Sequence, residues 1–255
     1  MNEELIVKMI PVVRALEVYH RHEVFGLSNI PKSGSVIIAS THSLATYDLV
    51  LLMHHIYEKF GRFPRSLIDR AFYKMPMIGS FMEDLGCVVG DQDNARSILS
   101  NGEILCIAPG GMKESLRPRT RKYQIDWGSR KGFARLAIET STPIILAACP
   151  SADDIFDVYE SKFTSWAYRR FKLPLFIAKG LGPTVLPKPA KLFHMLSEPI
   201  TPPVCADGPL TDEMVQNFHE QLQHKMTQLI CRATKMMNHE KKQKLLENVG
   251  EGPTP

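Results

Sequence analysis

Two residues near the start of the chain have the types and the spacing of a general base and its supporting carboxylate. His42 and Asp48 are separated by five residues. A neutral imidazole can take the proton of an attacking hydroxyl near pH 7, and a carboxylate on its other nitrogen fixes the tautomer and stabilises the imidazolium. The pair therefore indicates transfer chemistry in which His42 activates a hydroxyl and Asp48 orients the ring.

The sequence around this pair strengthens the interpretation, because a His and an Asp at this separation also occur by chance. Residues 36–39 form an apolar run that predicts a buried strand, and the apolar residues 49–53 predict a helix. His42 then lies in a polar segment that leaves the carboxyl end of a strand. Ligands of α/β sheets bind at that edge.

A second segment that can contact a ligand is Pro109-Gly110-Gly111, directly after the apolar run 104–108. Paired glycines at the end of a strand let backbone N–H groups approach a ligand closely, as an oxyanion or phosphate site requires. An ordinary tight turn is the alternative. The chain contains no Gly-x-Gly-x-x-Gly, Walker loop or Gly-x-Ser-x-Gly, so nucleotide and nucleophile-elbow sites of those types are not indicated.

The elements that must position these residues alternate between strand and helix along the chain. Apolar runs predict strands at 35–39, 66–68, 87–89, 104–108, 143–148, 174–178 and 192–196, and other segments predict helices, among them 78–85, 129–140, 155–171 and 211–247. Thr46 is expected to cap the helix after His42, and Gly61 to end it. The alternation predicts an α/β fold with a mixed, mostly parallel sheet flanked by helices. We assign residues 1–18 to an amphipathic N-terminal helix, 19–248 to a single domain and 249–255 to a disordered tail.

The composition is that of a globular protein, with 44% hydrophobic and 23% charged residues among 255. The net charge of +4 fits a weak preference for anionic surfaces. No stretch approaches eighteen uninterrupted apolar residues, so we expect no segment to span a bilayer. The pairs His20/His22 and His54/His55 lack cysteine or carboxylate companions at ligand spacing, and we predict no metal site and no cofactor.

The order of these motifs resembles the lysophospholipid/glycerol-phosphate acyltransferase superfamily over residues 19–202. The motifs are His42 with Asp48, the Ile-Asp-Arg segment ending at Arg70, Pro109-Gly110-Gly111, and a Pro-Ile-Ile run from Pro143. Most members have four residues between the histidine and the aspartate, where this chain has five. The usual Pro-Glu-Gly-Thr-Arg is replaced by residues 109–113, so the motif glutamate is absent and Lys113 takes the place of the arginine. With the run 127–134 (WGSRKGFA), these departures resemble the diacylglycerol-acyltransferase-like branch, which includes the phytyl ester synthases.

The resemblance implies a glycerol-phosphate-acyltransferase-type domain that moves a fatty acyl group from a thioester, usually acyl-CoA, to an alcohol. It makes His42 the base and Asp48 its partner. It also implies that Pro109, Gly110 and Gly111 border the acceptor or oxyanion, that residues 143–146 support the site, and that Arg70 and Lys113 lie near the acceptor. A lysine gives a point charge in place of a bidentate fork. We therefore expect a neutral acceptor such as diacylglycerol, which would make the product a triacylglycerol.

Two alternatives stay open at this point. One is a lysophospholipid or glycerol-3-phosphate acyltransferase of phospholipid synthesis, and the other is a non-catalytic lipid-binding protein with the same fold. In each case the expected partners are lipids at a membrane surface, with no nucleic acid. We expect a cytoplasmic, peripherally membrane-associated protein. Its N-terminal helix either packs on the domain or lies in the membrane interface together with basic residues of the chain.

Overall fold

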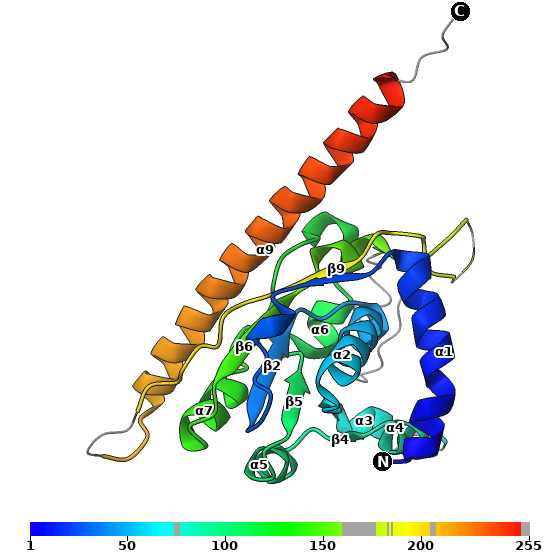
Figure 1. Ribbon diagram of the computed structural model, residues 1–255. Helices are drawn as coiled ribbons and strands as arrows, with labels where there is room; N and C mark the ends of the chain where they lie inside the picture. Colours follow the sequence, from blue (N-terminus) through cyan, green and yellow to red (C-terminus); the bar gives the residue numbers. More distant parts are fainter. Residues whose placement is uncertain (74–76, 160–176, 183, 185, 205–207, 251–255) are drawn as a thin grey trace, which may run out of the picture.

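A seven-stranded sheet with helices on both faces forms the centre of the molecule (Figure 1). The computed structural model describes residues 1–73, 77–159, 177–182, 184, 186–204 and 208–250. In sheet order the strands are β1 (Glu23–Phe25), β9 (Phe193–Leu196), β6 (Ile144–Ala148), β2 (Val36–Ser40), β5 (Ile104–Ile107), β3 (Arg65–Ile68) and β4 (Cys87–Val89). Strands β7 (Asp157–Tyr159) and β8 (Ile177–Lys179) form a separate antiparallel pair.

The sheet is mixed and mostly parallel, as the sequence predicts. Strand β2 runs parallel to both of its neighbours, β5 and β6, and β3 runs parallel to β4 and β5. The direction changes at β9, which pairs antiparallel with β6 and parallel with β1. The carboxyl ends of β2, β5 and β6 therefore lie side by side at one edge of the sheet.

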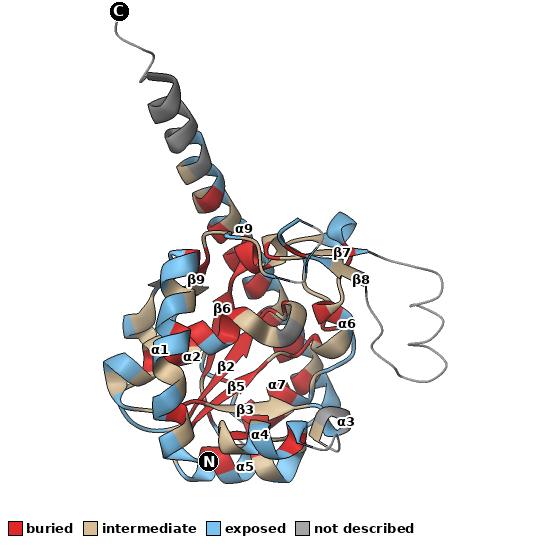
Figure 2. Cartoon of the chain, turned by 90° about the vertical axis from the view of Figure 1, so that its right-hand side faces the viewer, coloured by how far each residue is buried: buried red, intermediate tan, exposed pale blue. Residues whose placement is uncertain are grey.

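Helices cover the two faces of the sheet, and the side chains of the central strands point alternately to each. On one face Ile37, Leu105 and Leu146 pack against helices α5 (Gln92–Ser100), α7 (Gly132–Glu139) and α9 (Asp212–Gly250). On the other, Ile38 and Ile145 pack against α2 (Tyr47–Phe60), and α1 (Glu3–His20) lies outside α2. Burying each such aliphatic side chain contributes about 1.5–3 kcal/mol relative to leaving it exposed. Figure 2 shows these strands buried and the outer side of α1 exposed.

Short helices fill the connections between the layers. They are α3 (Arg70–Tyr73), α4 (Ile78–Asp84), α6 (Gly111–Ser115), and the 3₁₀ helices η1 (Leu27–Asn29), η2 (Leu44–Thr46), η3 (Arg119–Arg121) and η4 (Pro150–Asp154).

The segment from β2 to α2 differs locally from the prediction. Thr46 does not cap α2 through its side chain; it ends η2 in a left-handed conformation with φ 54°. This short 3₁₀ turn takes up the five residues between His42 and Asp48 and places Asp48 in the first turn of α2. The helix ends as predicted at Gly61, whose φ of 63° suits a residue without a Cβ.

One predicted helix is wrong. The helix expected over residues 155–171 is replaced at its start by strand β7, because Asp157, Val158 and Tyr159 pair with β8; residues 160–176 lie outside the described part. Helix α9 continues through Gly250, and residues 251–255 lie outside the described part, so the disordered tail stays a prediction. Pro11 lies inside α1, which is one continuous helix.

Among the described helices, none combines the length and the apolar character that crossing a bilayer requires.

Candidate active site

His42 lies at the edge where the parallel strands β2 and β5 end. It follows Ser40, the last residue of β2, by two positions, while Pro109 and Gly110 follow the end of β5. The backbone N–H of His42 donates a hydrogen bond of 2.8 Å to Oε1 of Glu114, which lies on α6 just after the glycines. The fold therefore brings the two predicted motifs together, and a side chain links them.

The ring of His42 is fixed by its own loop. Nδ1 lies 2.9 Å from the Ser43 carbonyl oxygen, to which it donates, so Nε2 carries the lone pair of the neutral ring. Burial lowers the pKa of His42 below the ordinary 6.5 of histidine, although the Ser43 hydrogen bond and the charge of Asp48 raise it. A neutral ring with a free Nε2 is the form that can accept a proton.

Asp48 supports His42 differently from the way the sequence predicts. No hydrogen bond joins the two side chains, because Nδ1 of His42 is already bonded to the Ser43 carbonyl. The fully buried Asp48 carboxylate accepts the hydroxyl of Ser43, and its Oδ2 lies 3.3 Å from Nε2 of His194. The negative charge of Asp48 still raises the pKa of His42. Asp48 therefore acts on the ring through its electric field and through Ser43.

Glu114 is a residue of the site that the motif comparison does not reveal, because the motif position itself holds Gly110. Its side chain is 1% exposed and accepts two backbone hydrogen bonds, from His42 (2.8 Å) and from Asp126 (2.9 Å). Burial raises the pKa of the Glu114 carboxyl, while these bonds and the nearby Arg117 charge oppose the rise. A glutamate three residues after the Pro-Gly-Gly turn is the available signal in the sequence, but the fold determines that its side chain points inward.

The glycines shape the loop, and their predicted contact with a ligand stays a prediction. A Cβ at Gly110 would lie 2.0 Å from Oε2 of Glu114, so only glycine leaves room for this carboxylate. Gly111 has a φ of 54°, and its N–H donates to the Ala108 carbonyl at 3.0 Å. That N–H is therefore occupied within the turn, and Pro109 is buried beneath it.

Two arginines that the sequence analysis did not single out lie around His42. Arg117, largely buried, donates 3.0 Å to the His42 carbonyl oxygen and lies 3.4 Å from Asp153. The exposed Arg130 donates 2.7 Å to the Gly110 carbonyl oxygen. The positive charges of both arginines lower the pKa of His42. Arg130 belongs to the run WGSRKGFA, so its residue type was visible, but its position beside Gly110 was not.

The two predicted acceptor cations, Lys113 and Arg70, each lie near a carboxylate of the protein. Lys113 lies 2.8 Å from Oδ2 of Asp126, and Arg70 lies 3.9 Å from Oδ2 of Asp91. Both side chains are more than half exposed. Neither side chain forms a hydrogen bond or an ion pair with His42.

His194 connects the site to a group of histidines behind it. It is fully buried on β9, and its Nδ1 lies 2.9 Å from Nε2 of His22. Since Nε2 of His194 faces the Asp48 carboxylate, Nε2 is the nitrogen placed to carry a proton, and Nδ1 is placed to accept from Nε2 of His22. The alternation of side chains within this strand favours a structural role for His194, but its contact with Asp48 depends on tertiary structure.

The fold also gives the paired histidines a carboxylate companion that their spacing does not show. Glu17 of α1 lies 2.8 Å from Nδ1 of His54 and 3.4 Å from Nε2 of His55. This carboxylate therefore comes from a tertiary contact, which the sequence spacing around the histidines does not reveal.

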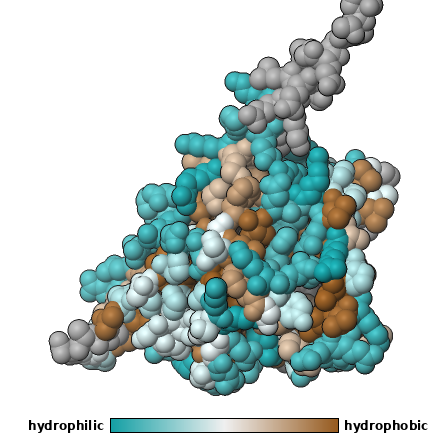
Figure 3. Space-filling view, in the orientation of Figure 1, coloured by the Kyte–Doolittle hydropathy of each residue, from teal (hydrophilic) through white to brown (hydrophobic). Residues whose placement is uncertain are grey.

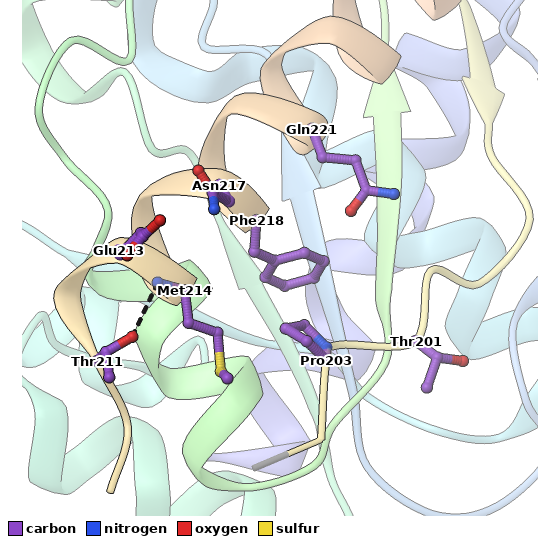
Figure 4. A pocket seen from close by; sticks show the side chains of 8 residues that line it. All are labelled: Thr201, Pro203, Thr211, Glu213, Met214, Asn217, Phe218 and Gln221. Atoms are coloured by element: carbon purple, nitrogen blue, oxygen red, sulfur yellow. Dashed lines mark hydrogen bonds between the residues drawn. The ribbon is translucent and has the colours of Figure 1, made fainter. Parts of the chain in front are cut away.

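An open groove of about 570 Å³ lies between the start of α9 and the segment after β9 (Figure 4). Phe218 and Met214 form its apolar wall, with Glu213 and Gln221 at the polar side. It contains none of the predicted site residues and is not part of the candidate active site.

Comparisons with known proteins identify the family of the chain. Residues 21–149 match the model of a family described as "Acyltransferase". The chain is 30% identical over 184 residues to the human protein named "DGAT1/2-independent enzyme synthesizing storage lipids", and 31% identical over 184 residues to its mouse counterpart. These alignments cover 72% of this chain and 55% and 54% of the relatives, so the chain spans about half of their length.

An uncharacterised protein of Mycobacterium tuberculosis is 24% identical over 226 residues, covering 84% of this chain and 63% of that protein. The crystal structure of the 1-acyl-sn-glycerophosphate acyltransferase PlsC from Thermotoga maritima matches with a TM-score of 0.46 and 16% identity, covering 85% and 79% of the two chains. The family match spans both β2 with His42 and the Pro-Gly-Gly turn, and the chain belongs to the acyltransferase family.

Proposed function

We propose that the protein transfers a fatty acyl group from acyl-CoA, or another acyl thioester, to the hydroxyl of a lipid alcohol, with His42 as general base. The observation that carries this proposal is the state of the His42 ring. The Ser43 carbonyl holds Nδ1 at 2.9 Å, which leaves Nε2 for the acceptor. Burial lowers the pKa of the ring, so it is neutral at pH 7.

The chemistry then follows from the position of Nε2. The acceptor hydroxyl gives its proton to Nε2 as its oxygen attacks the thioester carbonyl, and the C–S bond breaks as the ester forms. The imidazolium returns the proton to the leaving thiolate. The buried negative charge of Asp48 stabilises this imidazolium, because a nearby opposite charge favours the charged form of the ring.

A neutral acceptor such as diacylglycerol is supported by the pairing of Lys113. Its ammonium lies 2.8 Å from Asp126, so its charge is already balanced by the protein. The family relatives named for storage-lipid synthesis agree with a neutral lipid product.

Arg130 supports the second candidate, an acyltransferase acting on a lysophospholipid or glycerol 3-phosphate. Its exposed guanidinium stands beside Gly110 and has no carboxylate partner among the described residues. An arginine of this kind can bind a phosphate in a bidentate way. Purified protein given oleoyl-CoA with either diacylglycerol or lysophosphatidic acid separates the two candidates, and faster acylation of diacylglycerol is expected.

The non-catalytic alternative is tested in cells by mass spectrometry of neutral lipids after expression of the wild type and of His42→Ala. A new acylated lipid is expected with the wild type only, because removing a general base typically lowers the rate by roughly two to four orders of magnitude. His224→Ala, at an exposed position on α9, is the matched control and should retain the product. Identical lipid profiles for wild type and His42→Ala would leave a binding protein as the better description.

A further inference from the structure

Three residues from different elements come together behind the candidate active site. Glu17 lies on α1, His22 between α1 and β1, and His55 on α2. One possible ligand atom from each lies within 4.8 Å of the other two. Their chemistry, two imidazoles and one carboxylate, is a common donor set for a divalent transition metal.

Unpartnered nitrogens at this cluster need an explanation. His22 is 8% exposed, and its Nδ1 has no hydrogen-bond partner; Nε2 of His55 is likewise buried and unpartnered. Buried polar atoms without a partner are costly and rare, and an ion is one of the usual reasons for them.

One distance between possible ligand atoms fits tetrahedral coordination directly, and all three atoms lie within 4.8 Å of one another. The Glu17 carboxylate oxygen Oε1 lies 3.4 Å from Nε2 of His55. Two ligand atoms at about 2.0–2.1 Å from a tetrahedral Zn²⁺ are themselves about 3.3 Å apart. Little movement would therefore be needed at this edge of the site.

Neighbouring residues form hydrogen bonds to His22 and Glu17, as the residues around a metal site usually do to its ligands. His22 donates its other ring N–H to Nδ1 of His194 at 2.9 Å, and His194 in turn faces Asp48. Nδ1–H of His54 donates to the Glu17 carboxylate at 2.8 Å. Such outer hydrogen bonds fix the tautomer and the orientation of the ligands.

We propose that Glu17, His22 and His55 bind a divalent transition metal such as Zn²⁺, which ties α1 to α2 and to the start of β1. The fourth position is open to water. The site is structural and stands whether or not the protein transfers acyl groups, although it lies two hydrogen-bonded rings away from Asp48.

The test is Zn²⁺ binding by the full chain after removal of metals with a chelator. One Zn²⁺ per chain is expected, with a dissociation constant of about 1 µM or tighter and a raised melting temperature. Glu17→Gln, His22→Gln and His55→Gln should each weaken binding by at least about tenfold, and the exposed His224→Gln should not. Circular dichroism checks that each variant is folded.

A second measurement on the wild type protects the test against variants that do not fold. X-ray absorption at the zinc edge should report two imidazole nitrogens and no sulfur. Absence of tight binding to the wild type overturns the proposal. Binding that is lost in His54→Gln and Glu58→Gln but kept in His22→Gln and His55→Gln also overturns it, because the ion would then lie between Glu17, His54 and Glu58.

Discussion

At the scale of single residues, the ionisation of His42 reflects charges that oppose one another. Burial lowers its pKa, the negative Asp48 raises it, and the positive Arg117 and Arg130 lower it further. The sequence motif shows only the histidine and the aspartate. Arg117 and Arg130 come from later parts of the chain and reach His42 through the fold. The geometry therefore determines the pH range in which the base is neutral.

This balance predicts the pH dependence of activity. As the pH falls through the pKa of His42, the ring becomes protonated and kcat/KM should fall, with a midpoint below 6.5. Asp48→Asn should move the midpoint to lower pH, since it removes a charge that favours the imidazolium. Arg130→Gln should move it to higher pH. Profiles of kcat/KM against pH for the three proteins provide the measurement, and midpoints that coincide would mean that another group limits the rate.

At the scale of elements, the Pro-Gly-Gly turn and α6 act as a support for the His42 loop. Glu114 on α6 accepts a hydrogen bond from the His42 amide and so connects α6 to the His42 loop. Gly110 leaves the space that this carboxylate occupies. We expected the glycines to make room for a ligand. In the structure, the closest neighbour of Gly110 is a side chain of the protein itself.

Gly110→Ala tests this support. The new Cβ would overlap Oε2, Cβ and Cδ of Glu114 at 2.0–2.4 Å, so the free energy of unfolding should fall by about 1–3 kcal/mol or more. Activity should also fall, because Glu114 must shift away from the His42 amide. Urea denaturation with an activity assay measures both. Gly208→Ala, where a Cβ meets nothing within 4 Å, is the control and should change little. Equal effects of the two substitutions would argue against the role of Gly110.

The elements also show where sequence reasoning reaches its limit. The order of strands and helices and the position of His42 at a strand end were predictable, because apolar runs such as 36–39 and 144–148 are fully buried strands. The partners of Asp48 and Glu114 were not, since these depend on which loops meet in three dimensions. Strand β7 was missed for a related reason: its three residues are extended because they pair with β8.

At the scale of the whole molecule, α1 presents exposed valines on its outer surface, among charged side chains such as Lys8 and Arg14. Val7, Val12 and Val18 are 57%, 50% and 77% exposed, while Ile6 and Val13 pack inward. Figure 3 shows apolar side chains on the flank that α1 forms. Nearby α4 adds the exposed Phe81 and Ile78.

We expect this surface to contact membranes. Replacing Val7, Val12 and Val18 by serine should reduce flotation of the protein with liposomes that contain anionic lipid, since membrane binding scales with buried apolar area. The substitutions leave the inward residues of α1 intact, unlike a deletion of the helix. Val204→Ser, at an equally exposed valine outside α1, is the control. Unchanged flotation of the triple variant would exclude α1 as the contact.

Helix α9 has a consequence for how the molecule behaves in solution. Its 39 residues span about 58 Å, whereas a compact chain of this length has a radius of gyration of about 18 Å. The helix is anchored as far as Met237, which is buried, and Glu240, which pairs with Lys191, and it continues beyond the body to Gly250 (Figure 1). A projecting helix gives the molecule a higher frictional coefficient than a compact protein of the same mass has. An elongated monomer and a compact dimer can therefore have the same Stokes radius on gel filtration. Analytical ultracentrifugation or light scattering, which measures mass, distinguishes them.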